Sequence, residues 1–73
     1  MFVIYSVEGC TLCQQAKEWF SSREIPFEVR DAQECAEEVK SLAVGDRLPI
    51  VIIGDTPVSG YYPYRWIRLL ERQ

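Results

Sequence analysis

Apolar residues along the chain gather in short runs that alternate with longer stretches of helical periodicity. Residues 2–6 are largely apolar on both sides, which is typical of a central strand covered on both faces. Residues 26–30 alternate between apolar and polar positions, so we predict a second strand there. Because a helical stretch joins these two strands, we expect them to run parallel.

The second half of the chain carries the pattern of a β-hairpin. Leu48-Pro49 opens an apolar run at residues 50–53, and Gly54-Asp55 turns the chain into a short partner strand at residues 56–59. Proline has no amide hydrogen to donate, so Pro57 marks the partner strand as an edge of the sheet. The sequence therefore predicts four strands.

Three helices are predicted beside these strands. The first covers residues 10–23. The second begins at Asp31, where Glu34 completes a capping-box pattern, and ends at Gly45. The third begins near Pro63, because proline suits the first helical position. The apolar residues that recur at helical spacing and predict the inner faces are Leu12, Ala16, Trp19 and Phe20 in the first helix, Cys35, Val39, Leu42 and Ala43 in the second, and Trp66, Leu69 and Leu70 in the third.

The order of these elements predicts an α/β fold with the sequence β-α-β-α-β-β-α. A four-stranded mixed sheet with helices on both faces accommodates it. The chain has 73 residues, which corresponds to one domain over residues 1–73.

Composition narrows the classes of function. The net charge of −3 is unfavourable for binding nucleic acid, which favours a basic surface. No apolar run approaches the roughly 20 residues needed to cross a membrane, and the N-terminus lacks the features of a signal peptide. The three cysteines are an odd number, which fits a reducing cytoplasm better than a secreted disulfide framework. We therefore expect a cytoplasmic protein, and we expect it to be a monomer.

The pair Cys10 and Cys13 lies where the first strand runs into the first helix. The unpaired amide groups and the dipole of a helix N-terminus stabilise a thiolate. We therefore interpret Cys10 as the reactive thiolate and Cys13, one turn further on, as its resolving partner. A zinc site would need further ligands, and the chain has neither a histidine nor a second such pair. A structural disulfide and an iron–sulfur cluster shared between two chains are the other interpretations.

Several further residues are candidates for the same site. A cis peptide bond at Leu48-Pro49 would turn a backbone N–H and C=O toward the cysteines, where they could bind an extended substrate. Lys17 and Arg47 are candidate stabilisers of the Cys10 thiolate, or else solvated surface charges. Glu8 would oppose that thiolate by its like charge.

The third cysteine, Cys35, has two interpretations. It lies on the predicted apolar face of the second helix, where it would be a small buried hydrophobic residue. The alternative is a regulatory thiol.

Taken together, these motifs resemble the glutaredoxin-like thiol–disulfide proteins, and among them the NrdH-type redoxins most closely. The resemblance rests on Cys10-Thr11-Leu12-Cys13, Ala16-Lys17, Leu48-Pro49, Gly54-Asp55 and Ser59-Gly60-Tyr61-Tyr62-Pro63, in this order. It implies a thioredoxin fold with sheet order 2-1-3-4 and a cis proline at position 49. It also implies that the substrate-binding walls are formed by Thr11, Leu12, Leu48, Pro49, Ser59, Gly60 and Tyr61.

The resemblance further implies partners. NrdH-type redoxins supply electrons to ribonucleotide reductase, and their recycling enzyme would be a thioredoxin-reductase-like flavoprotein, which uses NADPH and FAD. The exchange itself needs no metal and no bound organic cofactor. A glutathione-dependent glutaredoxin is the alternative, although this chain lacks the acidic residues near the last helix that hold glutathione in that group.

Two more remote interpretations are binding proteins. Cys10-Thr11-Leu12-Cys13 with Ile25-Pro26-Phe27 is also similar to the start of arsenate-reductase-like proteins, some of which are redox-sensing regulators. Those chains are longer than 73 residues. An iron–sulfur binding module is the other.

Overall fold

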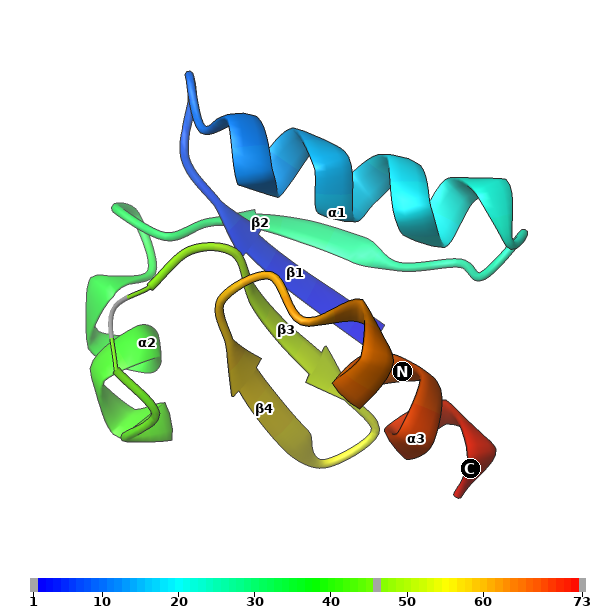
Figure 1. The fold of residues 1–73 in the computed structure, drawn as a ribbon. Helices are drawn as coiled ribbons and strands as arrows, with labels where there is room; N and C mark the ends of the chain where they lie inside the picture. The colour runs from blue at the N-terminus through cyan, green and yellow to red at the C-terminus, as the bar shows by residue number, and fades with distance from the viewer. Residues whose placement is uncertain (1, 46, 73) are drawn as a thin grey trace.

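The computed structural model describes residues 2–45 and 47–72 and contains the predicted order of elements. Strands and helices alternate along the chain until the hairpin near its end (Figure 1). The strands are β1 (Phe2–Ser6), β2 (Glu28–Asp31), β3 (Ile50–Ile53) and β4 (Thr56–Ser59). The helices are α1 (Thr11–Ser22), α2 (Ala36–Leu42) and α3 (Pro63–Glu71).

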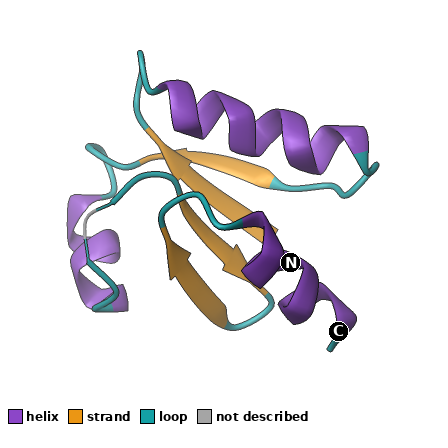
Figure 2. Ribbon diagram, in the orientation of Figure 1, coloured by secondary structure: helices purple, strands orange, loops and turns teal. Residues whose placement is uncertain are grey.

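Strand β1 lies inside a four-stranded sheet of order β2-β1-β3-β4. It runs parallel to β2 and antiparallel to β3, and β4 pairs antiparallel with β3 (Figure 2). Within β1, Ile4 pairs with Val29 on one side and with Val51 on the other. The mixed sheet and the edge position of β4 were predicted from the sequence pattern, and the sheet order was implied by the family resemblance. The structure confirms all three.

The two faces of the sheet bury different residues, because side chains alternate along each strand. Helices α1 and α3 cover one face, where Ile4 and Val51 pack with Phe20 and Trp66. Helix α2 covers the other face, where Val3, Tyr5 and Ile50 form a smaller cluster with residues that include Cys35, Val39 and Leu42. No helix in the described part of the chain is long and apolar enough to cross a membrane.

Helix α1 faces the sheet along a line that differs from the predicted one. Cys13, Ala16 and Phe20 are buried, whereas 45% of Leu12 is exposed. The prediction that Leu12 belongs to the buried stripe is therefore wrong. The reason is the position of Leu12 in the first turn of α1, directly after the connection from β1. In this turn Leu12 faces the loop before β3 and not the sheet. Trp19 remains half-buried between Phe20 and Trp66.

The second helix is shorter than predicted at both ends. The Asp31 carboxylate accepts the amides of Gln33 and Glu34, at 2.7 and 3.1 Å, and so caps a separate turn that precedes α2. Aspartate side chains commonly stabilise such turns in competition with a helix. The helix ends at Leu42 and not near Gly45, and its C-cap is Ala43, which is exposed and has a left-handed φ of 55°. The predictions for Asp31 as the helix cap, for Gly45 as its end and for Ala43 on the inner face are therefore wrong.

Candidate active site around Cys10 and Cys13

The connection between β1 and α1 places Cys10 at the end of the central strand. Gly9 has a φ of +82°, a left-handed conformation that glycine adopts without strain. The turn is closed by the Cys10 amide, which donates to the Val7 carbonyl at 3.3 Å. Cys10 is the N-cap residue of α1, and its carbonyl accepts the amide of Gln14 at 3.1 Å.

The Cys10 sulfur takes the place of the oxygen that usually caps a helix. Its Sγ accepts the backbone amide of Cys13 at 3.2 Å. This hydrogen bond holds the sulfur at the N-terminal end of α1. Cys10 is half-buried, so the residue is accessible. An accessible sulfur held in this position suits an attacking thiol.

Cys13 has the opposite environment. Only 1% of the residue is exposed. Burial, reinforced by the hydrogen bond with Cys10, raises the pKa of the Cys13 thiol from an ordinary 9.0 to about 11, although the Val7 backbone and the charge of Lys17 oppose this shift. Cys13 is therefore a protonated thiol at neutral pH. A thiol that lies close to Cys10 but stays protonated suits the role of a resolving thiol better than that of an attacking one.

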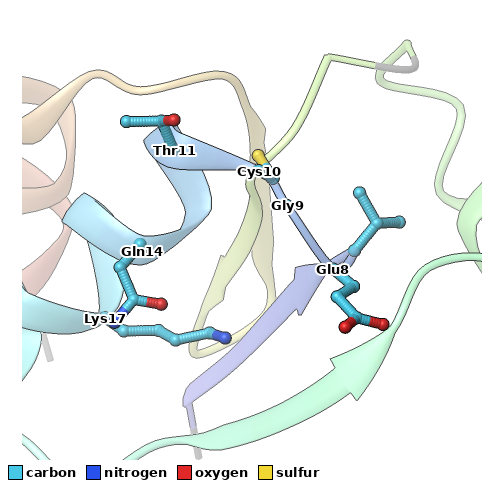
Figure 3. Close-up of a pocket in the computed structure, with 7 residues that line it drawn as sticks. Glu8, Gly9, Cys10, Thr11, Gln14 and Lys17 are labelled. Carbon is cyan, nitrogen blue, oxygen red and sulfur yellow. The ribbon is translucent and has the colours of Figure 1, made fainter.

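The charged candidates are distributed on different sides of Cys10. Lys17 is half-buried and lines a recess of about 460 Å³ together with Cys10, Thr11 and Gln14. The carboxylate of Glu8 also lines this recess but points away from the Cys10 sulfur (Figure 3). Arg47 is exposed and lies in a separate groove. The structure thus brings Lys17, and not Arg47, into the same recess as Cys10.

The loop before β3 carries the predicted cis proline. The Leu48-Pro49 peptide bond is cis, and Pro49 is fully buried. The Pro49 carbonyl accepts the amide of Gly60 at 2.8 Å. This carbonyl is therefore already engaged within the protein, and proline has no amide hydrogen. Backbone pairing with an extended substrate would fall to Leu48.

The Ser59 hydroxyl holds this loop in place. It accepts the Arg47 amide at 3.1 Å and donates to the Arg47 carbonyl at 2.9 Å. Sequence reasoning placed Ser59 among the substrate-binding residues, but its hydrogen-bonding groups are used within the fold. The geometry gives it a positioning function for the loop that carries Pro49.

A groove of about 380 Å³ lies between this loop and α1. Gly60 lines it with a φ of +104°, and a Cβ atom there would approach the Tyr62 ring to 2.7 Å. Any larger residue at position 60 would therefore displace Tyr62. Tyr61 packs perpendicular to the buried Trp66, with ring centroids 5.3 Å apart. The residues that line the groove are Leu12, Arg47, Leu48, Gly60, Tyr61 and Tyr62.

Gln14 and Tyr62 are among the lining residues that were not identified from the sequence as site residues. Gln14 lies four residues after Cys10, and helical spacing alone could have placed it on the same face. Tyr62 was recognised only as part of a motif; nothing in the sequence shows that its ring lies against Gly60. Cys35 lies apart from the site, half-buried beneath the other face of the sheet, where burial raises the pKa of its thiol. Among the described residues, no group of three or more cysteine, aspartate or glutamate side chains could hold a metal ion.

Comparisons with known proteins agree on one family. The profile of the Glutaredoxin family matches residues 2–58. The glutaredoxin-like protein NrdH of Lactococcus lactis is 32% identical over 71 residues, which cover 94% of this chain and 99% of that protein. A glutaredoxin-like protein from a rubredoxin operon of Clostridium pasteurianum is 29% identical and covers 99% of this chain and 100% of its own length.

Solved structures give the same result. The NrdH-redoxin of Escherichia coli superimposes with a TM-score of 0.81 at 30% identity, covering 93% of this chain and 92% of its own. A glutaredoxin from Archaeoglobus fulgidus has a TM-score of 0.82 at 23% identity, over 94% of this chain and 84% of its own, and shares the fold.

The buried thiol of Cys13 predicts a loss of stability at alkaline pH. The unfolded chain releases this proton near its ordinary pKa of 9.0 and the folded chain only near 11, so the stabilisation is complete below about pH 9 and is lost as the pH rises through 11. We expect the reduced wild type to lose about 2 kcal/mol more free energy of unfolding than Cys13→Ala between about pH 8 and pH 11. Urea denaturation under reducing conditions measures both. Equal losses of unfolding free energy in the two proteins would contradict the raised pKa of the Cys13 thiol.

Proposed function

Because this chain belongs to the glutaredoxin family, we propose that it reduces a disulfide of ribonucleotide reductase through Cys10 and Cys13. Its class of activity is thiol–disulfide oxidoreductase. The observation that carries the assignment of the two cysteines is the 3.2 Å hydrogen bond from the Cys13 amide to the Cys10 sulfur, with Cys13 buried one helical turn away.

The reaction proceeds in two exchanges. The Cys10 thiolate attacks one sulfur of the partner disulfide, forming a mixed disulfide and releasing the other partner sulfur as a thiolate. Cys13 then attacks the Cys10 sulfur, which breaks the mixed disulfide and releases the second partner thiol. Two electrons pass from the dithiol to the partner, and a Cys10–Cys13 disulfide remains.

The electrostatics of the site support this order. The charge on Cys10 is one of the causes that raise the pKa of Cys13. Once Cys10 is bonded to the partner, that charge is gone, while the lowering effects of Lys17 and the Val7 backbone remain. Cys13 is therefore easier to ionise in the mixed disulfide, where it must attack. Its proton passes to the departing thiolate of the partner.

The groove beside the dithiol supports a protein substrate. Leu12, Leu48 and Tyr61 offer apolar surface to an extended segment, and Arg47 adds a positive charge. The loop that forms this wall is fixed by Ser59 and Gly60, which reduces the cost of binding. Ribonucleotide reductase is proposed as the partner because the relatives in Lactococcus lactis and Escherichia coli are NrdH proteins.

The electron donor that fits this assignment is a thioredoxin-reductase-like flavoprotein, which carries FAD and uses NADPH. Electrons move only between sulfur atoms in the exchange, so the chain needs no resident cofactor. The protein would act in the cytoplasm as a monomer. The family profile also leaves a glutathione-dependent glutaredoxin as the second candidate.

Trapping the mixed disulfide tests the partner and the nucleophile together. We expect Cys13→Ser to form a stable, reductant-sensitive complex with oxidised ribonucleotide reductase, because Cys10 attacks and no thiol resolves the product. The matched control Cys10→Ser should form none, since Cys13 is buried and protonated. Non-reducing electrophoresis with mass spectrometry of the complex identifies the linked cysteines. Full disulfide-reducing activity in Cys10→Ser would refute Cys10 as the nucleophile. If Cys13→Ser formed no disulfide-linked complex with oxidised ribonucleotide reductase, the proposed partner would be refuted.

Two coupled assays distinguish the electron donors. In one, thioredoxin reductase recycles the oxidised protein; in the other, glutathione and glutathione reductase do so. NADPH oxidation at equal protein concentration is the measurement. We expect faster turnover with thioredoxin reductase, because this chain has no acidic residue at positions 60–64 to hold the ammonium group of glutathione. Faster turnover with glutathione would instead favour the second candidate.

A further inference from the structure

The outer face of α3 carries three arginines that the proposed reaction does not use. Arg65, Arg68 and the C-cap residue Arg72 are all exposed, and their spacing of three and four residues places them along one flank of the helix. We call this set the arginine stripe. Three of the eight basic side chains of the protein lie here, against one of its eleven acidic side chains, Glu71. This helix is therefore positive although the net charge of the whole chain is −3.

The helix dipole does not account for the whole stripe. It favours Arg68, which lies in the last turn of α3, but it disfavours Arg65, which lies in the first turn. Like charges three or four residues apart also repel each other on a helix. Both ion pairs in the described part of the chain belong to Arg30, so neither involves the stripe. The stripe is therefore available to a negatively charged partner.

An aromatic surface connects the stripe to the groove beside the dithiol. Tyr62 lines this groove and is also the N-cap residue of α3. Its ring packs nearly perpendicular to the ring of Tyr64, with centroids 6.1 Å apart. Tyr64 is 65% exposed and neighbours Arg68 by helical spacing. Arg47, which lines the groove, adds a positive charge at the other end of this path.

We propose that the arginine stripe binds an acidic segment of the protein substrate, next to the segment that enters the groove. This inference rests on the proposed reduction of a protein disulfide, and it adds a class of substrate: disulfides with carboxylate side chains a few residues away. From Arg65 to Arg72 the stripe is about 10 Å long at the rise of an α-helix. That length matches about three or four residues of an extended segment.

Two features favour a protein segment over other anionic partners. Tyr64 and Ile67 are exposed on the same helix and offer apolar contacts that a purely ionic ligand does not use. The net charge of −3 opposes the approach to an extended anionic surface such as a membrane. A short acidic segment meets only the local positive charge of α3.

Three peptide disulfides test the proposal. Each peptide has one cysteine, joined by a disulfide to mercaptoethanol, and a six-residue tail of alternating serine and glutamate, glutamine or lysine. The tail is therefore acidic, neutral or basic, and versions with the tail before and after the cysteine cover both directions of the segment. The measured quantity is the second-order rate constant at which the prereduced protein is oxidised by each peptide at low ionic strength.

The variants separate local charge from net charge and from folding. Arg65→Gln, Arg68→Gln and Arg72→Gln are made singly and together, and the triple change to lysine keeps the charge. Lys40 is exposed on α2, which covers the other face of the sheet, so Lys40→Gln is the matched control for each single variant. Thermal denaturation of every variant reports its stability.

We expect wild type to react about two- to fivefold faster with the acidic peptide than with the neutral one, the range that exposed ion pairs supply, and slowest with the basic one. Salt should reduce this preference, because it screens exposed charges. The triple glutamine variant should lose the preference, each single variant should lose part of it, and the triple lysine variant should keep it. Lys40→Gln should leave it unchanged.

Four results would overturn the proposal. They are equal rates with all three peptides in wild type, a preference that survives in the triple glutamine variant, the same loss in Lys40→Gln, and a lower melting temperature with equal slowing for all peptides. Binding of wild type to phosphatidylserine vesicles without any peptide preference would assign the stripe to a membrane instead. Reduction of the neutral peptide by wild type but not by Cys10→Ser tests the dithiol separately from the stripe.

Discussion

The site depends on one hydrogen bond, from the amide of Cys13 to the sulfur of Cys10 at 3.2 Å. It makes Cys10 the cap of the helix that carries Cys13, so the two sulfurs cannot be positioned independently. The same turn leaves Cys10 accessible and buries Cys13, which raises the pKa of the Cys13 thiol. The two proposed roles therefore correspond to two depths in the first turn of α1.

The second constraint is the antiparallel pairing of β1 with β3, in which Tyr5 lies opposite Ile50. It brings the end of β1 beside the start of β3, so Cys10 and Pro49 lie at the same end of the sheet although 39 positions separate them in the sequence. Two clamps then hold the loop before β3: the Ser59 hydroxyl on the backbone of Arg47, and the Gly60 amide on the Pro49 carbonyl. Both come from the β4 side, so the hairpin supports the loop before β3.

Sequence periodicity was sufficient for the strands and for the inward positions of Phe20 and Trp66, because these follow from burial on a sheet with two covered faces. The order of the strands in the sheet came instead from the family resemblance. Periodicity failed at residues whose surroundings are set by the packing of distant segments. Leu12 has helical spacing with Ala16, but it lies in a turn that faces the loop before β3 and lines the groove. Asp31 has the pattern of a helix cap but stabilises a turn that precedes α2. The recess shared by Cys10, Lys17 and Glu8 joins a connection to a helix, a proximity that one-dimensional spacing does not reveal.

The central claim is that Cys10 is the accessible, attacking cysteine while Cys13 is a buried thiol. The most direct test is the alkylation of the reduced, folded protein by iodoacetamide at neutral pH, followed at each cysteine by mass spectrometry. We expect Cys10 to react at least about tenfold faster than Cys13, because Cys10 is accessible whereas the Cys13 thiol is buried and has a raised pKa. Equal rates at Cys10 and Cys13, or faster reaction at Cys13, would contradict it.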